Sequence, residues 1–320
     1  MSLHPQVVSL LKMFEARGLP PIEKLPLSEA RAAFEKSSQL LSKPEHIVPT
    51  ENRMINGYEQ EIGIRVYTPE TETDRKLPAM VYFHGGGWVI GNINTHDSLC
   101  HSLAYLSNCI VIAVDYSLAP ESKFPVAVED AYLATKWVHD HALELGIDKQ
   151  QIAVGGDSAG GNLAAVVTYL AQQRKELSVN YQLLLYPSTS FDYTESYERY
   201  GEGYHLTKST MNWFREQYVS SVDDLLNPLA APMLFPENET SKLPSTFILT
   251  AEYDPLCDGG EAFAQKLITA GVEVNYVCYP GMIHGFLGMT EFVDDAKKAV
   301  QEIAKNIKAH FEKQTVDQQN

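Results

Sequence analysis

The sequence predicts an α/β protein whose mostly parallel sheet is covered by helices on both faces. From about residue 78 onward, short continuous apolar runs alternate with segments of helical periodicity. Continuous apolar runs are typical of strands buried on both faces, and strand–helix alternation is typical of parallel sheets. We expect strands at 80–83, 109–114, 152–155, 181–186, 246–250 and 272–278.

Two regions interrupt this alternation. Residues 1–50 have helical periodicity broken by prolines, and residues 188–225 hold eight aromatic residues among charges. Long insertions in compact domains are commonly functional. We therefore expect a core of residues 51–187 and 226–320, with the two interrupting regions folded over it as a helical cap. The alternative is that the aromatic residues only pack a small core of their own.

The composition indicates a globular protein and excludes several partners. The chain has 320 residues, 44% of them hydrophobic, and a formal net charge of -16. Such a surface repels phosphate backbones, so we expect no nucleic-acid partner. No apolar run is long enough to cross a bilayer, and the N-terminus lacks a secretory pattern, so we expect no membrane insertion and a cytoplasmic location. The four cysteines have neither paired nor zinc-site spacing, so we expect free thiols and no metal.

A short glycine–serine motif suggests a nucleophile. Residues 156–160 read Gly-Asp-Ser-Ala-Gly, between a predicted strand and a helix that begins with small residues. Glycines two positions before and after the serine allow a very sharp turn, which leaves the Ser158 hydroxyl exposed above a helix N-terminus. The alternative is a glycine–serine loop at an ordinary strand–helix junction.

A glycine run after the first predicted core strand suggests an oxyanion site. Residues 84–87 read His-Gly-Gly-Gly. Acyl transfer needs fixed N–H donors for the developing negative charge, and glycines expose backbone amides. We predict Gly86, Gly87 and Ala159 as the donors, with Gly85 the weaker candidate. We expect His84 to hold this loop, and the alternative is a merely flexible loop.

Two further side chains follow late predicted strands. His284 comes after the strand at 272–278, and Asp254 comes after the strand at 246–250. The carboxyl ends of parallel strands meet at one edge of the sheet, so both side chains should approach the serine as general base and orienting acid. Glu252 and Asp258 are rivals for the acid, and Asp157 is expected to be structural.

The longer motifs carry a family resemblance. They read HGGGW at 84–88, DYSLAPE at 115–121, GDSAGGNLAA at 156–165, YDPL at 253–256 and GMIHGF at 281–286. Over about residues 75–290 the chain resembles the bacterial hormone-sensitive lipase family of α/β-hydrolases. The resemblance implies the α/β-hydrolase fold and the same triad and oxyanion donors. It also implies a helical cap and a preference for short to medium acyl chains. The Ser158, Asp254 and His284 chemistry itself needs no metal or organic cofactor.

The sequence departs from the family pattern at two positions. The family usually has arginine where this chain has Ser117 and Cys257. Those arginines are structural in the family, so the departures bear on local ion pairs rather than on catalysis. Cys257 stands so near Asp254 that a redox-sensitive site is a further hypothesis.

These observations predict a carboxylic ester hydrolase acting on a small-molecule ester. Trp88, Leu206, Phe214 and Ile283 are candidates for an apolar substrate pocket, and each could equally be plain packing. A peptidase or amidase using the same groups is one alternative. A non-catalytic binding module is another; the plant gibberellin receptor resembles this family but lacks the histidine, which is present here as His284. A homodimer also stays open.

Overall fold

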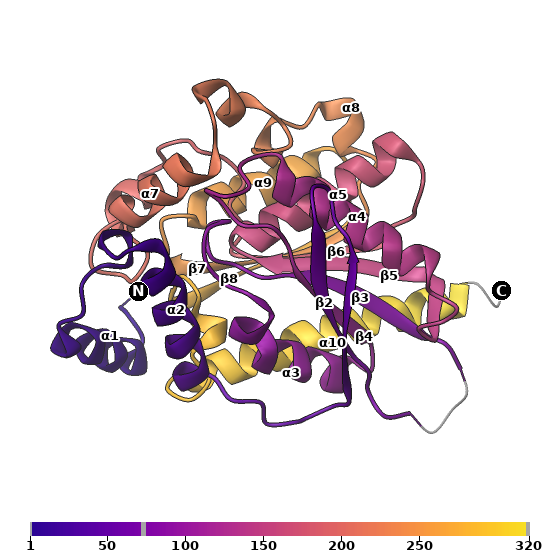
Figure 1. Cartoon of the computed structure of the whole chain (residues 1–320), viewed down its shortest axis with the longest axis horizontal. Coiled ribbons are helices and arrows are strands. Elements are labelled where there is room, and N and C mark those ends of the chain that lie inside the picture. The colour runs from indigo at the N-terminus through magenta and orange to yellow at the C-terminus, as the bar shows by residue number, and fades with distance from the viewer. Residues whose placement is uncertain (1, 72–74, 318–320) are drawn as a thin grey trace.

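The computed structural model describes residues 2–71 and 75–317, which form one eight-stranded sheet flanked by helices (Figure 1). The strands are β1 (Thr50–Asn56), β2 (Glu61–Tyr67), β3 (Leu77–Phe83), β4 (Ile110–Asp115), β5 (Ile147–Asp157), β6 (Tyr181–Leu185), β7 (Ser245–Tyr253) and β8 (Val274–Ile283). Their order across the sheet is β1-β2-β4-β3-β5-β6-β7-β8. Only β1 with β2 and β2 with β4 pair antiparallel, so the predicted fold class is confirmed.

All six predicted strands are present, as β3 to β8, but β1 and β2 were not predicted. Most side chains of β1 are exposed, and those of β2 alternate between buried and partly exposed positions. Neither strand therefore has the continuous apolar run that marks the central strands. The last strand also continues to Ile283, beyond the predicted end at 278. It lies at the sheet edge, where Pro280 is tolerated because its nitrogen need not donate to a neighbouring strand.

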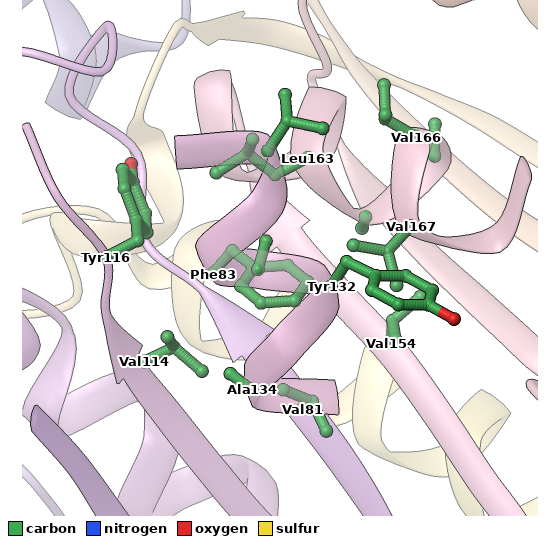
Figure 2. Close-up of a cluster of buried hydrophobic side chains, with 14 of the residues drawn as sticks. Val81, Phe83, Val114, Tyr116, Tyr132, Ala134, Val154, Leu163, Val166 and Val167 are labelled. Carbon is green, nitrogen blue, oxygen red and sulfur yellow. The ribbon is translucent and has the colours of Figure 1, made fainter. Parts of the chain in front are cut away.

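The strands divide the core into two layers. In β3, Val81 and Phe83 point into one cluster, while Met80 and Tyr82 point into the other. The first cluster lies under α4 (Val126–Asp140), α5 (Ala159–Arg174) and α9 (Cys257–Thr269), and Figure 2 shows part of it. The second lies under α3 (Asp97–Ser107) and α10 (Asp294–Asp317). No helix in the described ranges combines the length and apolar character needed to span a membrane.

The two regions that interrupt the alternation lie together in the structure. The first contains α1 (Pro5–Arg17) and α2 (Leu27–Leu41), and the second contains α6 (Glu195–Tyr200) and α7 (Lys208–Tyr218). Helices α1, α2 and α7 gather at one end of the molecule (Figure 1). The Thr210 hydroxyl of α7 donates to the Glu23 carboxylate at 3.0 Å, and the His4 amide before α1 donates to the Gly281 carbonyl of β8 at 3.1 Å. The first region is thus bonded both to the second and to the sheet edge.

The remaining helices are short. They are η1 (Ile22–Lys24), η2 (Ile93–His96), η3 (Val222–Leu226), η4 (Pro232–Leu234), α8 (Glu237–Thr240) and η5 (Phe286–Gly288).

The turn from β5 into α5 depends on glycine. A Cβ atom at Gly160 would lie 1.9 Å from the Phe83 carbonyl oxygen, and one at Gly156 would lie 2.4 Å from the same oxygen. Real Cβ atoms do not approach so closely, so the start of α5 packs directly against the carboxyl end of β3. This contact fixes where Ser158, midway between the two glycines, projects.

Gly160→Ala should therefore destabilise the fold. At an unobstructed helical position the same change stabilises by about 0.5–1 kcal/mol; here overpacking against β3 should lower the free energy of unfolding by about 1–3 kcal/mol. Urea unfolding followed by circular dichroism measures the difference. Gly259→Ala, also in the first turn of a helix, is the matched control, because its Cβ would meet only the Thr189 hydroxyl at 3.2 Å. Equal effects of the two changes would contradict the packing argument.

Candidate active site

Ser158 occupies a strained turn between β5 and α5. Its φ of 56° and ψ of -115° lie where non-glycine residues are rarely found. Its amide donates to the Leu185 carbonyl at 2.8 Å, which ties the turn to the end of β6. The half-buried side chain consequently stands at the carboxyl edge of the sheet.

The structure brings His284 and Asp254 to this serine. His284 Nε2 lies 3.0 Å from Ser158 Oγ, and His284 Nδ1 lies 2.7 Å from Asp254 Oδ2. Asp254 is completely buried, and its other oxygen accepts the Leu256 amide at 2.8 Å. Because the carboxylate accepts at Nδ1, the neutral imidazole carries its proton there and presents Nε2 as an acceptor to the serine hydroxyl.

The rival carboxylates have other partners. Glu252 accepts the Gly281 amide at 2.7 Å, and Asp258 accepts the Ser196 amide at 2.7 Å. Of the three acidic residues weighed from the sequence, Asp254 is the one hydrogen-bonded to His284.

The glycine loop after β3 faces the serine. Gly86 and Gly87 have φ values of 121° and 59°, in the region that favours glycine. A Cβ at Gly86 would lie 2.1 Å from the Ile90 carbonyl oxygen, and one at Gly87 would lie 2.2 Å from the Phe214 ring. Within residues 2–71 and 75–317, no protein acceptor takes up the N–H of Gly86, Gly87 or Ala159. All three residues line one cavity together with Ser158.

Asp157 fastens this loop to the serine turn. Its carboxylate accepts the Gly85 amide at 3.0 Å and the Tyr82 hydroxyl at 2.8 Å, and His96 Nε2 lies 3.0 Å away. Burial would raise the pKa of this carboxyl, but the charge interaction and hydrogen bond with His96 and the bond from Tyr82 outweigh it and lower the pKa below its ordinary value. These contacts fit the structural role expected for Asp157.

His84 braces the other side of the loop. Its ring stacks on Tyr116 with centroids 4.3 Å apart, and the Tyr116 hydroxyl donates to the His84 carbonyl at 2.7 Å. Burial, reinforced by His96, lowers the pKa of His84 to about 3, so the imidazole is neutral at pH 7. A neutral, stacked ring suits the loop-holding role expected for it.

The cavity above Ser158 has a volume of about 1050 Å³ and takes its walls from both interrupting regions. Three of the four candidate pocket residues, Trp88, Leu206 and Phe214, are among the residues that line it. Trp88 is only 4% exposed because its ring stacks on Tyr218 at 4.2 Å, so most of its surface packs the core.

Ile283 is not brought to this cavity. It is fully buried in the core cluster beneath α10 and does not line the cavity. The reason is that β8 continues through residue 283, so Ile283 belongs to the buried end of the strand and packs into the core with Met282 rather than emerging from a loop.

Three residues near the serine were not predicted. Phe14 of α1 and His205, between α6 and α7, both line the cavity, with ring centroids 5.6 Å apart. Tyr186 places its ring 4.9 Å from that of His284. Burial raises the pKa of Tyr186 well above its ordinary value, so it stays a neutral phenol. Tyr186 directly follows β6, so the strand-end argument applied to His284 would have found it, whereas nothing in the sequence places Phe14 beside His205.

Comparison with known proteins agrees with this geometry. A family profile described as the alpha/beta hydrolase fold matches residues 80–288. The chain belongs to this family. It is 36% identical to an ethyl acetate hydrolase of Pseudomonas putida over 97% of this chain and 100% of the relative. It is 38% identical to an arylesterase of Saccharolobus solfataricus over 90% of this chain and 93% of the relative.

Solved structures of esterases match the fold along nearly its whole length. An ester hydrolase from the Lake Arreo metagenome superimposes with a TM-score of 0.93 at 41% identity, covering 97% of this chain and 99% of the other. A hyperthermophilic esterase from Pyrobaculum calidifontis gives a TM-score of 0.90 at 43% identity, with the same coverage. The resemblance to the hormone-sensitive lipase family is confirmed, and the chain is an enzyme of the carboxylic ester hydrolase class.

Asp157→Asn should lower both stability and turnover. An amide cannot accept all the hydrogen bonds that the carboxylate takes, and leaving buried donors unsatisfied costs about 1–3 kcal/mol. A loosened glycine loop should reduce kcat for p-nitrophenyl butyrate by at least about 10-fold. Unfolding curves and steady-state rates measure the two effects.

The difference in the free energy of unfolding between the wild type and Asp157→Asn should also depend on pH, and the sign of this dependence follows from the lowered pKa of Asp157. A carboxyl whose pKa is depressed by folding stabilises the protein above its unfolded pKa, about 3.9, and loses that contribution as the pH falls through the folded pKa. The gap between wild type and Asp157→Asn should therefore narrow below about pH 4. Asp140→Asn, which breaks an exposed pair with Lys136, is the control and should change stability by less than about 1 kcal/mol. An unchanged kcat in Asp157→Asn would contradict its role in holding the loop.

Proposed function

We propose that this protein hydrolyses carboxylic esters of short to medium acyl length through Ser158, His284 and Asp254. The observation that carries the proposal is the continuous hydrogen-bonded chain from Ser158 Oγ to His284 at 3.0 Å and from His284 to the buried Asp254 at 2.7 Å. A serine within reach of a histidine that is itself oriented by a carboxylate has the geometry of an activated nucleophile.

In the first half of the reaction, Ser158 Oγ attacks the ester carbonyl carbon while His284 Nε2 takes the hydroxyl proton. Asp254 keeps the imidazole in its orientation and stabilises the imidazolium that forms. The carbonyl oxygen becomes an oxyanion and accepts hydrogen bonds from the N–H groups of Gly86, Gly87 and Ala159. Since these groups have no acceptor within the described part of the chain, they need no rearrangement to receive the charge.

The tetrahedral intermediate then collapses and His284 gives its proton to the leaving alcohol oxygen. The acyl group stays on Ser158 as an ester, which completes the first half. In the second half, a water molecule attacks the acyl carbon while His284 takes one of its protons, and a second oxyanion forms in the same site. Collapse releases the carboxylic acid and returns the proton to Ser158.

Residues 1–50 and 188–225 act as the cap that limits substrate size. Phe14 and Phe214 come from opposite halves of this cap and both line the cavity. The cavity, of about 1050 Å³, has ample room for esters of short to medium acyl length, which is the preference that the family resemblance implies. One relative is named an ethyl acetate hydrolase, after an ester with a two-carbon acyl group, and another is named an arylesterase.

Ser158→Ala should abolish most of the hydrolysis. Removing the nucleophile should lower kcat for p-nitrophenyl butyrate by at least about 10⁴-fold and prevent labelling by a fluorophosphonate probe. Ser190→Ala removes another hydroxyl from the same cavity and should keep both properties. Thermal unfolding checks that the variants fold. A Ser158→Ala variant that hydrolyses at a near wild-type rate would refute the assignment.

The acyl-length profile tests the role of the cap. Across p-nitrophenyl acetate, butyrate, hexanoate, octanoate and palmitate, kcat/KM should be greatest between acetate and octanoate and at least about 10-fold lower for palmitate. The expected reason is that the rings of Phe14 and Phe214, which line the cavity from both halves of the cap, obstruct an extended long chain. A rate that keeps rising to palmitate would contradict this size limit. Faster cleavage of a matched anilide than of the ester would instead indicate an amidase.

A further inference from the structure

Two of the four cysteines lie side by side behind the proposed acid. Cys257 is the first residue of α9, and Cys278 lies on the edge strand β8. Their Sγ atoms are 3.9 Å apart and both are reduced. Cys257 is buried, whereas Cys278 is exposed to solvent. One thiol can therefore meet a dissolved reagent while the other lies behind it, within contact distance.

The buried thiol belongs to the same turn as Asp254. The Cys257 amide donates to the Asp254 backbone carbonyl at 3.0 Å, and the Leu256 amide donates to the Asp254 carboxylate at 2.8 Å. The other oxygen of that carboxylate binds His284. A movement of Cys257 is consequently transmitted over three residues to the group that orients the histidine.

The partner thiol is anchored differently. Cys278 lies opposite Thr250 in the parallel ladder between β7 and β8. A residue held in a sheet ladder moves less easily than one at the first position of a helix, where helix ends fray. When the two sulfurs approach each other, the turn that carries Cys257 and Asp254 therefore has to give way more than the strand does.

We propose that Cys257 and Cys278 form an oxidation site that a hydroperoxide closes to a disulfide, and that this bond displaces Asp254 and slows ester hydrolysis. The effect on hydrolysis rests on the function proposed above, whereas disulfide formation does not.

The chemistry requires only the peroxide as oxidant. The Cys278 thiolate attacks one peroxide oxygen, the O–O bond breaks, and the other oxygen leaves and takes a proton to become water or an alcohol. Cys278 is now a sulfenic acid. The Cys257 sulfur attacks it, the S–O bond breaks, and hydroxide leaves with the Cys257 proton as water. Two thiols have lost two hydrogen atoms and the peroxide has been reduced.

The surroundings of each thiol determine which one reacts with the peroxide and which one resolves the sulfenic acid. A hydrogen bond from the Cys257 thiol, aided by Thr250 and opposed by burial, lowers the pKa of Cys278 to about 7. The same hydrogen bond, followed by burial, raises the pKa of Cys257. The exposed sulfur is thus the one that ionises and meets the oxidant, and the buried sulfur resolves the sulfenic acid.

Closing the bond needs a real displacement. A disulfide has an S–S distance of about 2.05 Å, so the sulfurs must approach by about 2 Å. Misplacing a catalytic group by about 1 Å costs on the order of 10²-fold in rate. Rotation of the two cysteine side chains takes up part of this approach, so Asp254 should move by less than about 1 Å. We therefore expect kcat to fall by about 10-fold.

The test oxidises the full chain with hydrogen peroxide, blocks the remaining thiols with iodoacetamide, and maps peptides without reduction. We expect one cross-linked pair containing Cys257 and Cys278 and a kcat for p-nitrophenyl butyrate about 10-fold lower, restored by dithiothreitol. Before oxidation, Cys278→Ser should hydrolyse the ester at the wild-type rate. After peroxide it should show neither the cross-link nor the fall in kcat. Cys100→Ser, which removes a buried thiol elsewhere, should respond as the wild type does.

A second readout follows the pair in the reduced protein. Alkylation of Cys278 by iodoacetamide should rise with pH around 7 in the wild type. In Cys257→Ala, which removes the hydrogen-bond donor, the midpoint should move toward the ordinary thiol value of about 8.5. A merely structural role for Cys257 would not move this midpoint.

Several outcomes would overturn the proposal. These are no internal cross-link, cross-links only between chains, over-oxidation of Cys278 alone, or a complete cross-link with unchanged kcat. Failure of the proposed function is distinguishable, because the reduced chain would then show no ester hydrolysis that depends on Ser158.

Discussion

The contact between the start of α5 and the carboxyl end of β3 determines the rest of the site. Because neither Gly156 nor Gly160 has a side chain, the helix comes close enough to the strand to force Ser158 into its strained backbone conformation. The same closeness puts Asp157 within hydrogen-bond distance of Gly85 on the loop that follows β3. One steric requirement therefore positions both the hydroxyl and the peptide groups that face it.

The two-layered core keeps this contact rigid. Alternate residues of β3 are buried in different clusters, so the strand is held from both faces by helices far apart in the chain. Close-packed interiors resist small displacements, which is what a strained turn needs in order to persist. The carboxylate follows β7 and the histidine follows β8, the two strands at one edge of the same sheet.

The sequence predicted the parts of the site that strand ends bring together. Ser158, Asp254 and His284 each follow an apolar run, and parallel strands place such positions at one edge whatever their separation in the chain. Ile283 was misjudged because the apolar run of β8 was assumed to stop before Pro280, although an edge strand accepts that residue. The contact of Phe14 with His205 depends on how two distant helical regions meet, and short-range periodicity carries no information about that. The antiparallel strands β1 and β2 lacked the burial on which the strand predictions depended.

The ring of Phe214 lies where a side chain on Gly87 would have to be, so α7 rests directly on a peptide group of the loop. The ring covers one side of that peptide group and keeps water from it. Because hydrogen bonds are stronger where water is excluded, the same ring strengthens the bonds that this part of the loop can donate.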